Sequence, residues 1–186
     1  MEILIAGLLL WSLVHFTPSL AQALKKGLIM KLGENGYKLL FTVLMLTSLA
    51  LIIYGWRHTE PTFLYALSPV FRHIAMMLVL LAFILLGSAN RPSRLGCIIR
   101  HPMLMGVVVW SFAHLLVNGD SRSVVLFGGM GVWALLEMVF INRRDGSWVK
   151  PSAPTWGREL RGLVISLVVF VVVFLLHPFL TGVALR

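Results

Sequence analysis

Long apolar runs separated by short polar segments dominate the sequence. Six of these runs are 18 to 22 residues long and lie at 3–23, 37–56, 70–89, 101–118, 122–141 and 160–181. A helix of about 20 apolar residues crosses the hydrocarbon core of a bilayer. Runs such as GLVISLVVFVVVFLL do not alternate between apolar and polar residues, as the strands of a membrane barrel do. We therefore predict an all-α polytopic membrane protein, a bundle of six transmembrane helices that forms one domain over residues 1–186.

The composition excludes an ordinary soluble domain. Hydrophobic residues make up 59% of the chain and charged residues only 12%, about half the share in soluble domains. The segment AQA at 21–23 resembles a signal-peptide cleavage site. However, the opening residues MEILIAG carry Glu2 and no basic residue, unlike the basic start of a signal peptide, so we expect the first span to be retained.

Basic residues are distributed unequally between the two predicted sides of the membrane. If the N-terminus faces outward, twelve of the sixteen lie in inner segments: Lys25, Lys26, Lys31, Lys38, Arg91, Arg94, Arg100, Arg143, Arg144, Lys150, Arg158 and Arg161. The outer four are Arg57, Arg72, Arg122 and Arg186. Inner loops are enriched in Lys and Arg, so we predict a bacterial inner-membrane protein with both termini on the periplasmic side. The net charge of +9 then reflects topology and contact with anionic lipid, and nothing indicates nucleic acid binding.

Four histidines fall in the middle and outer parts of the predicted spans, where an imidazole without a partner is costly. They are His15, His73, His114 and His177. Zinc or di-iron would favour cysteines, carboxylates or an E-x-x-H pair. The spans contain no cysteine and no E-x-x-H pair, and their one carboxylate, Glu137, lies at the inner level, away from these histidines. The single cysteine, Cys97, lies in an inner loop and is expected to be inert. Two histidines from different helices suit a b-type haem, and the lack of C-x-x-C-H excludes a covalently attached one.

Small and aromatic neighbours favour a haem near two of these histidines. Trp110 and Gly106 share a helical face with His114, and the glycine would let a flat macrocycle or another helix approach closely. Trp11 lies one turn before His15. At about 1.5 Å per residue His15 lies roughly 10 Å deeper than His114, so a shared haem requires a tilted or kinked first span, or an oblique ring.

A second polar group is predicted at the inner ends of the fourth and fifth spans. His101 precedes His114 by thirteen residues, about 20 Å along a helix, and therefore belongs to a different site. The short connection at 118–120 makes the two spans antiparallel neighbours, which returns Glu137 to the level of Arg100 and His101. This inner cluster is either a structural clamp or a site for an anionic or nucleotide-like ligand.

The stretch RHPMLMGVVVWSFAHLLVNGD at 100–120, followed by LFGGMGVWALLEM and NRRDG, resembles the NnrU family of bacterial membrane proteins. LWSLVHFTPSL near the start and LLHPFLTGV near the end fit the same pattern, so the resemblance covers nearly the whole chain. It implies a role linked to denitrification and nitric oxide metabolism. The family is similar to 15-cis-zeta-carotene isomerase, a membrane enzyme that depends on haem b, which implies isomerisation of a lipophilic polyene as another activity.

This resemblance also implies residue roles. His15 and His114 become the expected axial ligands of the haem iron, His101 a support for the fold, and His73 our reserve ligand. Ser111 stands where the isomerase has a cysteine proposed as an alternative ligand, and a hydroxyl is a poor ligand for haem iron. The implied partners are the lipid bilayer, a lipophilic substrate and a redox partner, while catalytic acids or bases and the oligomeric state are not indicated.

Two other functions stay open from the sequence. Arg100-His101-Pro102-x-x-x-Gly106 also resembles the R-H-P-x-Y-x-G segment of membrane methyltransferases that use S-adenosylmethionine. Leu104 replaces the tyrosine, and the acidic pair expected near the end of those enzymes is absent. The third reading is a structural or regulatory membrane protein without a cofactor, in which the histidines only pair helices.

Overall fold

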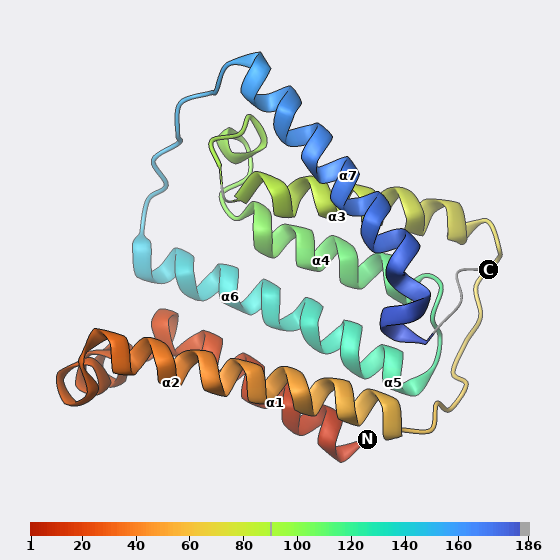
Figure 1. Cartoon of the computed structure of the whole chain (residues 1–186), viewed down its shortest axis with the longest axis horizontal. Coiled ribbons are helices and arrows are strands. Elements are labelled where there is room, and N and C mark those ends of the chain that lie inside the picture. Colours follow the sequence, from red (N-terminus) through yellow and green to blue (C-terminus); the bar gives the residue numbers. More distant parts are fainter. Residues whose placement is uncertain (90, 183–186) are drawn as a thin grey trace.

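The transmembrane part of the chain is helical in a computed structural model that describes residues 1–89 and 91–182 (Figure 1). The elements in chain order are α1 (Glu2–Leu20), α2 (Gln22–His58), α3 (Phe71–Ala89), the short turn η1 (Leu95–Cys97), α4 (Pro102–Leu115), α5 (Ser121–Ser123), the π-helical segment η2 (Val124–Gly128), α6 (Gly129–Asp145) and α7 (Trp156–Thr181). The all-α prediction is confirmed. Arg186, placed on the outer side by the sequence, lies outside the described residues.

Five helical stretches in the described chain are long and apolar enough to cross a membrane: α1, α2, α3, the continuous stretch Ser121–Asp145, and α7. The fourth predicted span, 101–118, is shorter than expected. It forms α4, an apolar helix of 14 residues, which covers about 21 Å at about 1.5 Å per residue. A hydrocarbon core is about 30 Å thick, so α4 alone does not cover its full depth.

The start of α2 also differs from the prediction of 37–56. Its helical backbone begins at Gln22 and is interrupted at Gly33, which has a φ of 72° and a ψ of 170°. Glycine adopts this conformation readily because it has no Cβ. The break separates an arm that carries Lys25, Lys26 and Lys31 from the apolar helix that follows, and these lysines interrupt the apolar run on which the prediction of spans depends.

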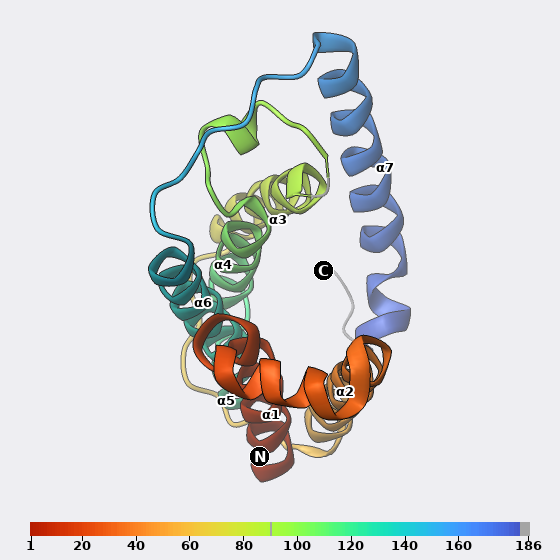
Figure 2. The same cartoon turned by 90° about the vertical axis from the view of Figure 1, so that its left-hand side faces the viewer.

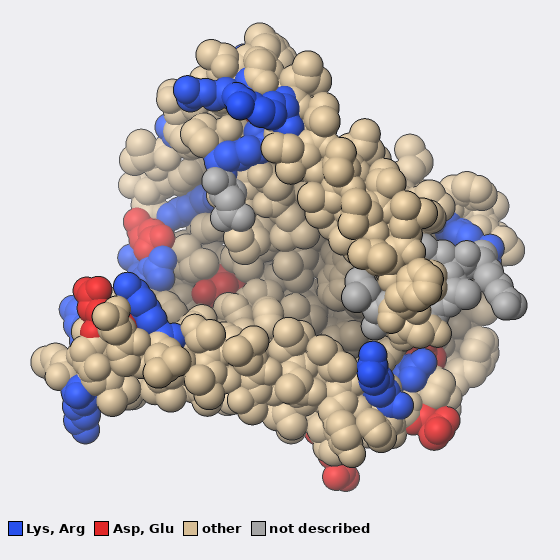
Figure 3. Space-filling view, in the orientation of Figure 1, with Lys and Arg blue, Asp and Glu red and all other residues tan. Residues whose placement is uncertain are grey.

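The helices form a curved wall with one helix standing apart. α2 packs on α1, α1 on α6, α6 on α4 and α4 on α3, while α7 packs mainly on α3 (Figure 2). In the space-filling view the surface is hollowed between α2 and α7, with α4 and α6 behind (Figure 3). The described rims of this hollow lie on lipid-length helices, so the hollow opens toward the bilayer.

Close helix contacts depend on glycine. An ideal Cβ on Gly7 of α1 would lie 2.8 Å from the backbone nitrogen of Ile52, and a Cβ on Gly55 of α2 would overlap the backbone of Leu4. Leu4, Ile52 and Leu8 form a buried cluster between these two helices. Small residues that let backbones approach are a common basis of helix packing in membranes.

The two ends of the bundle are built differently. At the end that holds Met1, which we name the terminal end, the backbone N–H groups of Leu64 and Tyr65 both donate to the carbonyl of Gly119, at 2.8 and 3.0 Å. The Tyr65 hydroxyl donates to the carbonyl of Leu115 at 2.6 Å. The loop before α3 thereby covers the loop after α4.

The opposite end, which we name the basic end, relies on charged side chains. Buried Glu159 of α7 lies 3.7 Å from an Arg91 guanidinium nitrogen and accepts from the Arg94 backbone N–H at 3.1 Å. The Arg94 guanidinium lies over the Trp156 ring, 3.6 Å from its centroid. Lys and Arg gather over this region, where α6 ends and α7 begins (Figure 3).

Candidate functional site

His114 of α4 presents an imidazole with one ring nitrogen paired and the other without a partner among the described residues. Its Nδ1 lies 2.9 Å from the backbone carbonyl oxygen of Trp110, one turn earlier in the helix. A nitrogen beside a carbonyl oxygen carries the proton, which assigns a lone pair to Nε2 in the neutral ring. Nε2 has no hydrogen-bond partner among the described residues. This is the tautomer and the second contact that a metal-binding histidine uses.

Aromatic rings fix the orientation of this imidazole. Phe127 stacks on it with centroids 4.4 Å apart and an interplanar angle of 26°, and Trp110 lies 4.8 Å away. Phe127 is buried and belongs to the π-helical segment η2, a local widening of the helix that is frequent at functional sites. The predicted neighbour Trp110 therefore contacts His114, whereas Phe127 was not anticipated from the sequence.

His15 of α1 repeats the same local arrangement. Its Nδ1 lies 3.0 Å from the carbonyl oxygen of Trp11, and its Nε2 has no partner among the described residues. Its ring lies 4.5 Å from Trp11, 4.7 Å from Trp133 of α6 and 6.0 Å from Phe41 of α2. The two ring nitrogens of His15 are thus in the same hydrogen-bonding state as those of His114.

The structure does not bring His15 and His114 into contact. Ser111 of α4 lies beside Gly131 of α6, 3.3 Å from the position of an ideal Cβ there, so His114 lies about three residues to the terminal side of that level. The His15 ring contacts Trp133 of α6, which lies two residues from Gly131 toward the basic end. The two imidazoles therefore differ in depth by about 7 Å at about 1.5 Å per residue. Their role as a ligand pair for one iron stays a prediction.

Two further residues of the predicted haem site, Gly106 and His73, do not lie against the His114 ring in the way the sequence suggested. Gly106 of α4 meets α3, because an ideal Cβ would lie 3.1 Å from the backbone oxygen of Ala82 and 3.3 Å from the Leu85 Cβ. Of the two neighbours that the sequence allowed at this glycine, a macrocycle or a helix, the structure contains the helix. His73, the reserve ligand, is exposed near the start of α3.

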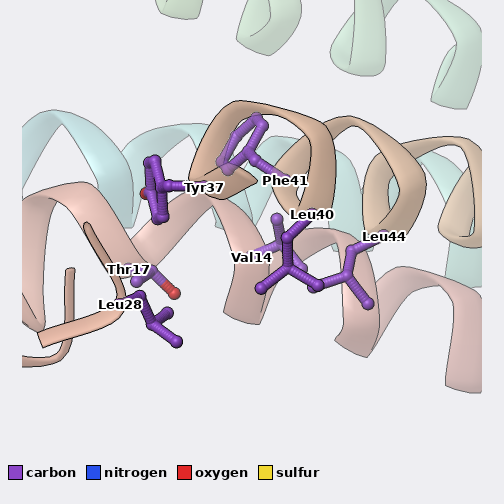
Figure 4. A pocket seen from close by; sticks show the side chains of 7 residues that line it. All are labelled: Val14, Thr17, Leu28, Tyr37, Leu40, Phe41 and Leu44. Carbon is purple, nitrogen blue, oxygen red and sulfur yellow. The ribbon is translucent and has the colours of Figure 1, made fainter. Parts of the chain in front are cut away.

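A small cavity adjoins the His15 region but is not large enough for a cofactor. It has a volume of about 50 Å³. Pockets for cofactors occupy about 300–1,000 Å³. Figure 4 shows the seven side chains that line it, from α1 and α2: Val14, Thr17, Leu28, Tyr37, Leu40, Phe41 and Leu44. A macrocycle would instead require the hollow between α2 and α7.

The inner polar cluster is present but is connected differently from the predicted clamp. Buried Glu137 accepts a hydrogen bond from the Ser19 hydroxyl at 2.9 Å, which joins α6 to α1. Sequence reasoning missed Ser19, although Trp11, His15 and Ser19 recur every four residues and so share one face of α1. This spacing was the available signal.

The other two members of the inner cluster bind the end of α6. His101 Nε2 lies 2.8 Å from the side-chain oxygen of Asn142, and an Arg100 guanidinium nitrogen donates to the carbonyl of Gly146 at 2.7 Å. Neither makes the predicted hydrogen bond to Glu137. Both therefore connect α4 and the loop before it to the basic end of α6.

No group of three or more His, Cys, Asp or Glu side chains within residues 1–89 and 91–182 could hold a bare metal ion. Single imidazoles with free Nε2 atoms in aromatic surroundings suit a prosthetic group that brings most of its own iron ligands. The fold and this site together define a polytopic helical membrane protein with ligand-competent histidines in its interior.

Comparison with known families specifies this class further. The family model of the NnrU protein matches residues 3–185, and the chain belongs to the NnrU family. No curated protein and no solved structure matches the chain.

Proposed function

We propose that this NnrU-family protein binds haem b within the membrane and that His114 is an axial ligand of the iron. The observation that carries the proposal is the state of the His114 ring: Nδ1 is bonded to the Trp110 carbonyl, and Nε2 has no partner among the described residues. An imidazole left in this state at membrane depth is costly unless a ligand completes it.

The residues around His114 fit a haem. Phe127 and Trp110 restrain the ring, and the hollow between α2 and α7 adjoins the wall that α4 and α6 form. When bound, haem supplies a redox-active iron whose reactivity depends on its axial ligands. The chain contributes the ligand, its tautomer and orientation, and a cover at the terminal end that keeps water out through the contacts of Tyr65 with α4.

Two chemistries are compatible with such a centre. The family implies nitrogen-oxide metabolism, and its likeness to the carotene isomerase implies isomerisation of a lipophilic polyene. The opening of the hollow toward lipid supports a substrate that partitions into the bilayer in either case. The methyltransferase alternative receives less support, because Arg100 and Gly106 are engaged by Gly146 and α3.

The test is an absorption spectrum of the full-length protein purified in detergent from haem-replete cells, first oxidised and then reduced with dithionite. We expect a Soret band stoichiometric with protein and resolved α and β bands after reduction. His114→Ala should lower haem content by about tenfold or more, at least the scale on which the supporting residues of metal sites act.

His58→Ala is the matched control. The His58 Nδ1 also lies close to a carbonyl oxygen one turn earlier, that of Tyr54 at 2.8 Å, but its ring is exposed at the end of α2. This variant should retain full haem content. A featureless wild-type spectrum, or equal haem content in both variants, would refute the proposal.

A further inference from the structure

We infer that His177 of α7 faces His114 across the hollow and supplies the second axial nitrogen to the same iron. This inference rests on the proposed haem function and replaces His15 as the partner of His114. The structure places His177 at the right depth, on the right face of its helix and in the right hydrogen-bonding state.

Depth follows from α3, which packs against both α4 and α7. Gly106 of α4 lies against the α3 segment 82–86, and Phe170 of α7 contacts Phe83, with ring centroids 5.8 Å apart. From these contacts both helices run toward the terminal end. His114 lies eight residues beyond Gly106, and His177 lies seven beyond Phe170. The two histidines therefore share one level to within about one helical turn.

The face of α7 follows from its contacts with α3. Ser166 lies against Gly87, and Phe170 contacts Phe83. Phe174 and His177 continue this row at spacings of four and three residues, which keeps them on one side of a helix. The Phe170 and Phe174 rings are in contact at 6.0 Å. His177 is thus turned toward the bundle, and it is half-buried although many of its neighbours on α7 are exposed to lipid.

The hydrogen-bonding state leaves His177 free to bind iron. Its Nδ1 lies 3.4 Å from the Thr181 hydroxyl, and its Nε2 has no partner among the described residues. His177 also lies close enough to His114 for their charges to interact. α7 packs mainly on α3 rather than on α4, so the two histidines come from helices that have no extensive contact with each other.

Two other candidate ligands, His15 and Ser111, do not offer the same geometry. His15 lies about 7 Å deeper at about 1.5 Å per residue, on α1, which packs on α2 and α6 and not on α7. Ser111, one turn before His114, is buried against Gly131 and presents only a hydroxyl. Two neutral imidazoles, from His114 and His177, would make a haem b bound in the hollow six-coordinate and low-spin.

The experiment compares the spin state of the iron in wild-type protein, His177→Ala and His15→Ala, purified in detergent, by electron paramagnetic resonance and absorption spectroscopy. We expect the iron to be low-spin both in the wild type and in His15→Ala. His177→Ala should retain haem on His114 but become high-spin, and added imidazole should restore the low-spin signal by filling the vacated position.

Each outcome decides the question. A wild type without haem overturns the proposed function and this inference with it. If the wild type contains haem and His177→Ala stays low-spin, this inference alone is overturned. If His15→Ala is then high-spin, the ligand pair is His15 and His114. Thermal unfolding followed by circular dichroism checks that each variant keeps its fold, so that a high-spin signal is not due to a loosened bundle.

Discussion

His101 and His114 belong to the same short helix segment and differ in what their second ring nitrogen meets. At the basic end, His101 Nε2 is occupied by the side-chain oxygen of Asn142 at 2.8 Å, while at the terminal end His114 Nε2 has no partner among the described residues. The first histidine therefore joins two helices, and the second is available to a ligand. Residue type and burial do not separate these roles, whereas the hydrogen-bond partner of the second nitrogen does.

The contrast extends to the two ends of the bundle. The terminal end is closed by backbone groups, as in the contacts between Tyr65 and Gly119, and the basic end by flexible charged side chains, as in the pair of Arg91 and Glu159. Backbone contacts cannot yield to an added atom, but long side chains can move aside. The predictions below test this difference, beginning with the largest expected effect.

Gly119→Ala should be severely destabilising. A Cβ at this position would overlap the backbone carbonyl of Tyr65, so the two loops must separate and the cover over α4 is lost. We expect the free energy of unfolding to fall by about 3 kcal/mol, at the upper end for an overpacked site. The measurement is unfolding in mixed micelles followed by circular dichroism.

Gly162→Ala at the basic end is the matched comparison. Its Cβ would overlap the Arg91 guanidinium, the far end of a flexible side chain, and we expect a loss of about 1 kcal/mol, at the mild end of overpacking. Equal losses in the two variants would contradict the distinction between the ends.

Ser19→Ala should have a medium effect. It removes the hydroxyl that donates to buried Glu137 and leaves a carboxyl group without this partner, at a cost of about 1–2 kcal/mol. Thr17→Ala is the control, because the Thr17 hydroxyl donates to the Leu13 carbonyl in an exposed position and its loss should cost about 0.5 kcal/mol or less. The same unfolding assay applies, and a Ser19 effect no larger than the Thr17 effect would show that Glu137 finds another partner.

His101→Ala should have the smallest effect on stability and none on haem. Loss of the bond to Asn142 should cost about 0.6 kcal/mol, the average for polar contacts between membrane helices. Haem content, measured by the pyridine haemochrome assay, should equal that of wild type. A loss of haem comparable with that of His114→Ala would erase the contrast between His101 and His114.

Much of the fold could be read from the apolar pattern. Five of the predicted spans correspond to membrane-length helices, and the short connection at 118–120 correctly made the fourth and fifth segments neighbours. The helical arm before Gly33 could not be found in this way, because lysines interrupt its apolar residues and its end depends on a backbone angle. The length of α4 was overestimated because apolar residues continue past Leu115 into the loop.

The candidate site was partly predictable. The two histidines with neighbouring tryptophans were selected from residue type and spacing, and the Nε2 of each has no hydrogen-bond partner among the described residues. The stacking of Phe127 on His114 and the depth shared by His114 and His177 depend on how α3, α6 and α7 pack. Sequence spacing within one helix carries no information on such contacts.

The length of α4 has a consequence for electron supply to the proposed haem. A helix of about 21 Å within a hydrocarbon layer of about 30 Å leaves roughly 9 Å of membrane depth to loops. Irregular backbone at that depth needs partners within the protein, and the Gly119 carbonyl finds them in the backbone N–H groups of Leu64 and Tyr65. An aqueous electron donor docked at the terminal end would therefore approach His114 through a few loop residues instead of a full leaflet, which makes the tunnelling distance to an iron at this position short.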